Sequence, residues 1–312
     1  MQDIIFHHYP VSPFSEKIRL ILGYKNLSWK SVMIPSIMPK PDVVALTGGY
    51  RRTPILQIGA DIYCDTALIA DVLERIAPTP SLYPASISGV AKIVAQWADT
   101  TLFWPVIAYT FQPAAMAGIL GNLTPEQMKA FGSDRAAMRA NAPRMTLSEA
   151  TGQLTEYLRR LDAMLANDIN QAWLLGSEAS IADFSVYHSL WFIRRVPAVA
   201  GILDAHPKLL AWMDKVAAIG HGQFEKMRSG DAIQIASTSI ACSAVDLAFI
   251  DTHVIALGDR VAIMPSDYAM DAVVGELVIC SGNALALRRT DERAGTVVVH
   301  FPRIGYQMKR AD

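Results

Sequence analysis

The sequence predicts a chain of three parts: an α/β domain, an all-helical domain and a small C-terminal β barrel or sandwich. A short apolar strand at residues 4–6 leads directly into a hydroxyl-bearing turn and an amphipathic helix. Residues 86–225 have the apolar spacing of helices, whereas beyond Gly230 short Val-, Ile- and Ala-rich runs alternate with evenly spaced glycines. The expected domains are 1–80, 86–228 and 232–312.

The first domain is expected to combine strands and helices. Apolar runs bounded by turn residues predict strands, and amphipathic runs that follow a capping residue predict helices. The expected strands are 4–7, 28–34, 54–58 and 62–64, and the expected helices are 15–24 and 65–77, with one short helix between them.

The rest of the chain changes from helices to short strands. Aromatic residues are concentrated in the first long helix of residues 86–225, and a second strong helix is expected at 148–166. Ser180 and Asp183 have the spacing of a capping box, in which two side chains bond each other's backbone at a helix start. The strands expected in the tail are 253–257, 260–264, 276–279, 284–288 and 296–301.

Composition restricts the possible functions. The chain has 312 residues, of which 52% are hydrophobic and 18% charged, and its net charge is −1. A chain of this kind builds ordinary globular cores and gives no reason to expect a nucleic-acid partner. The three cysteines form no metal-ligand spacing and suit a reducing cytosol. No signal peptide is visible, so we expect a cytoplasmic location. Because no metal-ligand spacing is present, we expect no metal. The cysteines are Cys64, Cys242 and Cys280.

One uncharged segment, residues 100–125, is long enough to span a bilayer. Two prolines, Pro105 and Pro113, and two polar residues, Gln112 and Asn122, interrupt it. We therefore expect a buried helix that lines a cleft or a dimer interface, and no membrane contact.

Ser12 stands at the strand-to-helix turn, where free backbone N–H groups favour an anion. A free thiol has a pKa near 8.5, so only about 3% of it is ionised at pH 7, and lowering this pKa by two units needs about 2.7 kcal/mol. A hydroxyl that donates to the charged sulfur contributes roughly 1.5–3 kcal/mol, and a helix end roughly 0.3–1 kcal/mol. Ser12 could therefore activate a bound thiol; alternatively, it only caps the helix.

Three ordered motifs carry a family resemblance over residues 1–80. Ser12, Pro54 and the pair Asp65-Thr66 resemble the serine turn, the cis-proline and the acid–hydroxyl pair of the thioredoxin-like domain of glutathione transferases. Ser12 aligns with the catalytic serine of the zeta and theta classes, where the omega class has cysteine.

The tyrosine classes of this family provide an alternative. Their catalytic position falls on His8, and Tyr9 is expected to point to the opposite strand face. The resemblance therefore implies a serine-type enzyme with Ser12 as its catalytic residue.

The resemblance also implies a ligand set for glutathione. Thr53 would pair its backbone with the peptide beside cis-Pro54, and Asp65 and Thr66 would hold the γ-glutamyl end. Lys40 lies where the family often contacts the glycyl carboxylate. The residues expected to bind glutathione are Phe14, Lys40, Thr53, Pro54, Asp65 and Thr66. Those expected to line an electrophile pocket, or alternatively to be core, are Trp104 and Tyr109.

The function implied is glutathione-dependent transfer or isomerisation on a small apolar electrophile, with a role in detoxification and a homodimeric assembly. One alternative is a non-catalytic scaffold that uses its β domain to recognise a partner or ligand. A second is a dehalogenase-like or reductive enzyme. Because every residue expected to bind glutathione precedes position 67, a fragment of residues 1–230 is expected to bind glutathione without the tail. The tail is expected to fold separately.

Overall fold

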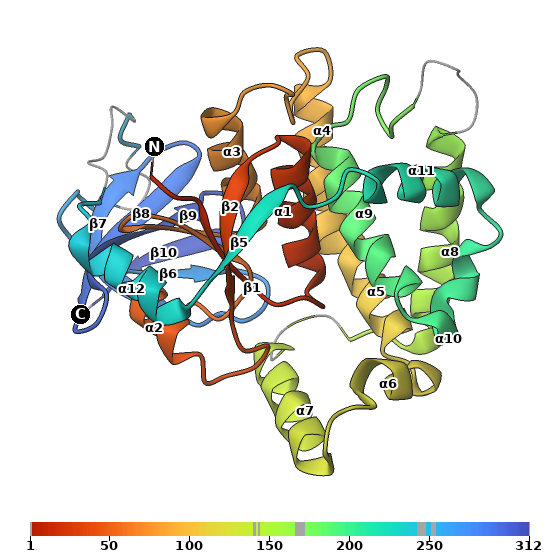
Figure 1. The fold of residues 1–312 in the computed structure, drawn as a ribbon, viewed down its shortest axis with the longest axis horizontal. Coiled ribbons are helices and arrows are strands. Elements are labelled where there is room, and N and C mark those ends of the chain that lie inside the picture. The colour runs from red at the N-terminus through yellow and green to blue at the C-terminus, as the bar shows by residue number, and fades with distance from the viewer. Residues whose placement is uncertain are drawn as a thin grey trace.

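The computed structural model describes residues 2–139, 142, 144–165, 172–241, 248–250 and 254–311, so Cys242 lies outside the described residues. Within them, a ten-stranded mixed sheet has the order β10-β6-β7-β8-β9-β4-β3-β1-β2-β5. The helical domain packs on one side of its N-terminal strands (Figure 1).

The N-terminal α/β domain has the expected thioredoxin-like arrangement. β1 is parallel to β2 and antiparallel to β3, which in turn pairs with β4. Its helices cover both faces, since α1 and α3 share the core of the helical domain whereas α2 belongs to the core on the other face. The elements are β1 (Ile5–His8), α1 (Pro13–Tyr24), β2 (Ser28–Met33), α2 (Pro41–Thr47), β3 (Ile55–Ile58), β4 (Asp61–Cys64) and α3 (Thr66–Ile76).

The helical domain is organised around its buried helix α9. The predicted capping box at its start is present: the Ser180 N–H donates to Asp183 Oδ2 at 2.9 Å. Asp183 also accepts from the N–H of Leu174 and from Trp212 Nε1, which ties three segments together. The helices are α4 (Ser88–Trp97), the π-helical turn Ala98–Leu102, α5 (Phe103–Thr110), α6 (Pro113–Leu120), α7 (Pro125–Arg139), α8 (Leu147–Met164), α9 (Ile181–Arg194), α10 (Pro197–Ala200) and α11 (Pro207–Ala217), with a 3-10 turn at Gly201–Leu203.

The uncharged segment 100–125 forms α5 and α6, which meet at a sharp bend. In the described part of the chain no single helix is long and apolar enough to cross a membrane. The run Ser88–Thr110 passes that test only together with Pro113–Leu120, to which it is bent by 93°. Both parts line a cavity described below, as expected for a cleft-lining helix.

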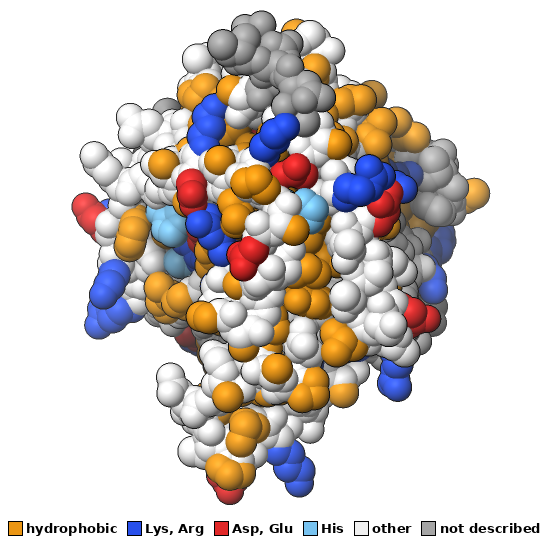
Figure 2. Space-filling view, turned by 90° about the vertical axis from the view of Figure 1, so that its right-hand side faces the viewer, with side chains coloured by type: hydrophobic (Ala, Val, Ile, Leu, Met, Phe, Trp, Pro, Cys, Tyr) orange, Lys and Arg blue, Asp and Glu red, His pale blue; other side chains and the backbone are white. Residues whose placement is uncertain are grey.

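On the face shown in Figure 2, basic and acidic side chains are interspersed and not separated by sign. At the lower end, α6 and α7 project from the body (Figures 1 and 2). Asp134 is the buried residue of α7, and its carboxylate accepts from the Met38 N–H and from Arg51. Polar contacts therefore hold α7 against the N-terminal domain.

The chain returns to the sheet at β5 (Gln223–Met227), a segment predicted to be mostly helical. That prediction is wrong because β2 has an unpaired edge, with which β5 pairs in parallel. Trp29 Nε1 donates to the carbonyl of His221 at 2.9 Å and fixes the approach. Helix α12 (Ser229–Thr238) then leads to the tail.

The tail adds five strands to the other edge of the sheet. β9 pairs in parallel with β4, with Ile62 opposite Val299. The predicted barrel or sandwich is not confirmed, because these strands continue the N-terminal sheet. Four predicted strands are confirmed, whereas residues 254–257 form none and the last strand was not predicted. The strands are β6 (Arg260–Pro265), β7 (Val273–Cys280), β8 (Ala284–Asp291), β9 (Gly295–Pro302) and β10 (Tyr306–Arg310).

The tail and the N-terminal strands share one apolar core. Ile5 and Ile62 of the first domain are fully buried in the same cluster as Val299 and Phe301 of the tail. The structure therefore gives no support to a tail that folds separately, since removing it would expose the N-terminal half of that cluster to water.

Phe301→Ala tests the shared core. Phe301 is fully buried and packs against Tyr50 and Tyr306, so the variant should lose roughly 3–5 kcal/mol of unfolding free energy. Urea unfolding followed by tryptophan fluorescence and by circular dichroism should give one coincident, shifted transition. The exposed Thr296→Ala on the same strand is the control. An unchanged fluorescence transition beside a weakened second one would mean that the tail unfolds independently.

Candidate functional site

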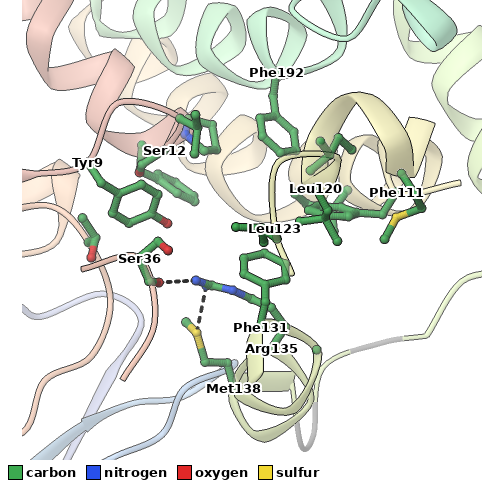
Figure 3. A pocket seen from close by; sticks show the side chains of 18 of the residues that line it. Tyr9, Ser12, Ser36, Phe111, Leu120, Leu123, Phe131, Arg135, Met138 and Phe192 are labelled. Carbon is green, nitrogen blue, oxygen red and sulfur yellow. Dashed lines mark hydrogen bonds between the residues drawn. The ribbon is translucent and has the colours of Figure 1, made fainter. Parts of the chain in front are cut away.

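Two cavities lie beside the start of α1 and share four residues: Phe14, Arg52, Thr53 and Tyr268. The larger, of about 640 Å³, is bounded by the turn before α1 and by α5, α6 and α7, with Phe192 pointing in from α9 (Figure 3). The smaller, of about 380 Å³, lies between the start of α3, α4 and loops of the tail. An extended molecule that passes Thr53 could occupy both.

Ser12 caps α1 and also lines the larger cavity. Its Oγ accepts the N–H of Ser15 at 3.2 Å, as helix capping requires. A hydroxyl has one donor and two lone pairs, so the O–H remains available to donate to a group in the cavity. Capping and thiolate stabilisation are therefore compatible roles for Ser12.

Tyr9 lines the same cavity as Ser12, and its ring points into it (Figure 3). As expected, Tyr9 lies on the opposite face from His8: Tyr9 packs against the core on the α2 side of the sheet, whereas His8 stacks on Phe6 in the other core. It nevertheless reaches the larger cavity, because that cavity extends around the turn that follows β1. Tyr9 is thus a second hydroxyl donor at the site, which sequence reasoning missed.

A buried charge network supports the start of α1. The carboxylate of Glu16 lies in the first turn, where a free negative charge would oppose a thiolate. Burial raises its pKa, but hydrogen bonding to His221 and the charge of Arg19 outweigh this and lower it overall. Arg19 Nη2 lies 2.7 Å from Glu16 Oε2. Glu16 therefore stays ionised, and the positive charge of Arg19 balances its negative charge.

His8 belongs to the same network and is structural. Its Nδ1 lies 3.1 Å from Arg19 Nη1, and its Nε2 lies 2.9 Å from the hydroxyl of Ser31. Burial and the charge of Arg19 lower the pKa of His8 to about 3. His8 is therefore neutral and does not replace the catalytic tyrosine of the tyrosine classes.

Asp65 and Thr66, the residues expected to hold the γ-glutamyl end, line the smaller cavity together with Pro54. The Thr53–Pro54 bond is cis, as the resemblance implies. Asp65 caps α3, accepting the Ala67 N–H at 2.9 Å.

The other oxygen of Asp65 accepts the hydroxyl of Tyr306 at 3.2 Å, and Tyr306 lies 2.9 Å from the hydroxyl of Tyr50. Burial raises the pKa of Asp65, although the charges of Arg52 and Lys17 oppose this. The tail thus orients the carboxylate expected to receive an ammonium group.

A buried ion pair that the sequence did not reveal lies under the smaller cavity. Lys17 Nζ is 2.6 Å from Asp99 Oδ2 and donates to the hydroxyl of Thr66 at 3.2 Å. His188 Nε2 lies 2.9 Å from the other oxygen of Asp99. Lys17 places a positive charge beside the N-terminus of α3, and no local sequence signal connects residues so far apart.

Lys40 lies in the larger cavity and contacts Thr53. Its Nζ donates to Thr53 Oγ1 at 3.0 Å and to the Arg51 carbonyl at 3.3 Å. Burial, followed by the charge of Arg135, lowers the pKa of Lys40 to about 8. An anion beside Lys40 would favour its charged form.

Of the two residues expected to line an electrophile pocket, Trp104 lines a cavity and Tyr109 does not. Trp104 lines the larger cavity and packs edge-on against Tyr268. Tyr109 lines neither cavity; its hydroxyl donates to the Val199 carbonyl at 3.3 Å, because this face of α5 packs against the helical domain. Tyr109 is therefore a partly buried residue packed against the helical core, whereas Phe14 lines both cavities.

The tail contributes walls that sequence reasoning assigned to the first two domains. The guanidinium of Arg52 lies 3.9 Å from the ring centre of Tyr268 and donates to the Asp267 carboxylate and the Tyr268 carbonyl. Because Tyr268 lies at the junction of the cavities, the fragment 1–230 would lack part of the site.

Cys64 behaves as a small apolar residue. It is fully buried, and burial raises the pKa of its thiol well above the usual range. In the described residues no group of three or more His, Cys, Asp or Glu side chains has the arrangement of a metal site.

Comparison with protein families shows which family these features define. A glutathione S-transferase N-terminal domain model matches residues 6–81, and a C-terminal domain model matches 112–219. The crystal structure of a GST-like protein from Pseudomonas syringae has 41% sequence identity to this chain and a TM-score of 0.84. The match covers 100% of each chain. The chain belongs to the glutathione S-transferase family, whose members use glutathione as co-substrate.

More distant structures share the fold of the first two domains. Glutathione transferase GSTFuA2 from Phanerochaete chrysosporium is 19% identical, covered over its whole length by 72% of this chain, with a TM-score of 0.54. A glutathione S-transferase from Rhodospirillum rubrum is 18% identical, with 69% of this chain and 88% of that chain covered and a TM-score of 0.52. Comparison with curated proteins gives no match.

Asp99→Ala should destabilise the protein by roughly 3–5 kcal/mol, because the side chain of Lys17 is fully buried and would lose its counter-charge. Asp214→Ala removes an exposed partner of Arg194 and should cost less than about 1 kcal/mol. Urea unfolding measures both. Equal small losses would show that Lys17 finds another partner or stays neutral.

Proposed function

We propose that the protein binds glutathione across the two cavities and joins its sulfur to the carbon of a small apolar electrophile. The observation that carries this proposal is the junction at Thr53. The smaller cavity, on one side of Thr53, has the Asp65 carboxylate and the N-terminus of α3. The larger cavity, on the other side, has Lys40 and the start of α1. This order of charges complements that of a γ-glutamyl tripeptide with a central thiol.

The smaller cavity suits the γ-glutamyl end. Asp65 pairs with the ammonium group of the γ-glutamyl residue. The carboxylate of the same γ-glutamyl residue accepts hydrogen bonds from the start of α3 and from the hydroxyl of Thr66. Lys17, 3.2 Å from that hydroxyl, adds a positive charge beside the carboxylate. The cysteine backbone pairs with Thr53 beside the cis bond, and Lys40 binds the glycyl carboxylate.

The thiol reaches the larger cavity beside Ser12. The Ser12 hydroxyl and the start of α1 stabilise the thiolate, and Glu16 does not oppose this because the charge of Arg19 balances its own and His221 hydrogen-bonds it. In a substitution, the sulfur bonds to the electrophilic carbon, the leaving group takes the bonding electron pair, and the thiol proton passes to solvent. The apolar walls of α5, α6 and α7 hold the electrophile.

A scaffold role without catalysis is the weaker alternative. A scaffold would use the helix cap that Ser12 makes, but it gives no role to the O–H that Ser12 keeps available toward a cavity adjoining a second one. The homodimer, the cytoplasmic location and the detoxification role stay predictions.

Calorimetric titration with S-methylglutathione tests binding without thiol ionisation. In the free protein Lys40 loses its proton as the pH rises through about 8, so the charged form that binds a carboxylate is depleted above that pH. Affinity should fall about tenfold between about pH 7 and pH 9.

Lys40→Arg should flatten this pH profile, because arginine keeps its charge throughout. A ligand-side cause would leave the slope unchanged in this variant. The absence of any heat in the wild type would contradict the proposed function.

Removal of the Ser12 hydroxyl should raise the pKa of bound glutathione by about one to two units, since a hydrogen bond to a charged group is worth roughly 1.5–3 kcal/mol. Ser12→Gly is preferred to Ser12→Ala because glycine is the better helix cap. Thiolate absorbance titrated against pH measures the shift.

Tyr9→Phe is the matched variant, because Tyr9 also lines the larger cavity with a hydroxyl. Its thiol pKa should stay close to that of the wild type. A shift in Tyr9→Phe together with none in Ser12→Gly would identify Tyr9 as the donor instead.

A further inference from the structure

Helix α7 forms one wall of the larger cavity, yet none of its residues belongs to either apolar core of the described chain. Its longer apolar side chains, Met128, Phe131 and Met138, follow helical spacing and line the cavity together with Arg135 (Figure 3). Asp134 is the buried residue of the helix. An amphipathic helix whose apolar face borders a cavity lacks the core packing that stabilises most helices in proteins.

The start of α7 is complete in itself. Thr124 and Gln127 form a capping box, in which the Thr124 N–H donates to Gln127 Oε1 at 2.9 Å and the Gln127 N–H donates to Thr124 Oγ1 at 3.3 Å. The preceding helix α6 is anchored differently, because Ala115 belongs to the helical core. The connection at residues 121–124 therefore joins an anchored helix to a self-contained one, as a hinge does.

Polar contacts near the C-terminal end of α7 attach it to the N-terminal domain. Asp134 Oδ1 lies 2.7 Å from Arg51 Nη2 and accepts the Met38 N–H at 3.0 Å. Arg135 donates to the carbonyl of Ser36, as a dashed line in Figure 3 marks. We call these three contacts the latch. They consist of hydrogen bonds and an ion pair, and not of packed apolar side chains.

Two further contacts of α7 bury none of its side chains. The Met138 carbonyl accepts the N–H of Ala269, from the tail, at 2.8 Å. The ring centre of Phe131 lies 6.4 Å from that of Phe111, near the outer limit of aromatic contacts. The attachment of α7 therefore depends mainly on the buried carboxylate of Asp134.

The latch meets the N-terminal domain on the segments that hold Lys40. Ser36 and Met38, which contact α7, lie on the same loop as Lys40. Lys40 Nζ donates to the carbonyl of Arg51 at 3.3 Å, and the guanidinium of Arg51 pairs with Asp134. A ligand that fixes Lys40 therefore also fixes the attachment points of the latch.

From these contacts we infer that α7 is a lid over the larger cavity, latched by Asp134 and held more firmly when an anion occupies Lys40. In the latched position its apolar face covers a ligand in the cavity, and after release it moves at residues 121–124 to admit one. The coupling is reciprocal, so the latch also tightens the ligand at Lys40. The lid does not rest on the proposed function, whereas its coupling to glutathione does.

Hydrogen exchange of the full-length protein tests the lid. A helix of this length is marginal in water once detached, so detachment exposes its amides to exchange. The amides of α7 should exchange at least about 100-fold faster than those of the buried helix α9. Asp134→Asn should accelerate α7 at least about tenfold more and change α9 less than about twofold, because it breaks the ion pair of the latch.

Glu74→Gln is the matched control. It breaks another buried ion pair, with Lys25 at 2.6 Å, and neither residue lines the larger cavity. Exchange of α7 should stay within about twofold of the wild type in this variant. If Asp134→Asn also accelerates α9, Arg51→Gln breaks the same pair from its other side. Acceleration of both helices in that variant too would overturn the latch.

Saturating S-methylglutathione tests the coupling. It should slow exchange of α7 at least about fivefold in the wild type but not in Asp134→Asn, and calorimetry should show at least about threefold weaker binding by the variant. Exchange of α7 as slow as that of α9, or unchanged by Asp134→Asn, would overturn the lid. Heat of binding without protection of α7 would overturn the coupling. No heat would contradict the proposed function, and exchange of the free protein decides the lid in either case.

Discussion

The parallel pairing of β9 with β4 is the constraint on which the rest of the architecture depends. It covers an edge of the N-terminal sheet that would otherwise expose unpaired N–H and C=O groups. His300 Nε2 lies 2.7 Å from Asp61 Oδ1 across this junction. The pairing fixes where the following turn and the β6–β7 loop lie, and so brings Tyr306 to Asp65 and Tyr268 to Arg52.

Buried charge is the second organising principle. Lys17 is fully buried beside Asp99, and Glu16 is buried beside Arg19. Desolvating such groups is expensive, and the expense is offset only when every charge has a partner with good geometry. At the wall of the larger cavity, Arg51 and Arg52 follow the same rule, since they pair with Asp134 and Asp267.

Sequence analysis found the parts of the site whose backbone geometry depends on a few consecutive residues. Ser12 before Pro13, Thr53 before Pro54, and Asp65 before Thr66 each announce a local backbone geometry, and the structure has each of them. Local patterns also located most strands of the tail. They could not show that those strands join β4, because pairing between distant segments leaves no mark in a window of neighbouring residues. For the same reason Lys17, Tyr268 and Tyr306 were missed, and Tyr109 was assigned to a pocket although its hydroxyl faces Val199.

The junction of β4 with β9 also has a consequence for biosynthesis. Domains generally fold as units while the ribosome proceeds from the N-terminus. Here β4 leaves the ribosome long before β9 exists, so its edge waits unpaired while the helical domain and α12 are translated. The carboxylate of Asp65 cannot meet Tyr306 until residue 306 has emerged, 241 positions later. A nascent chain therefore completes the contact of Asp65 with Tyr306 only after the helical domain has been translated.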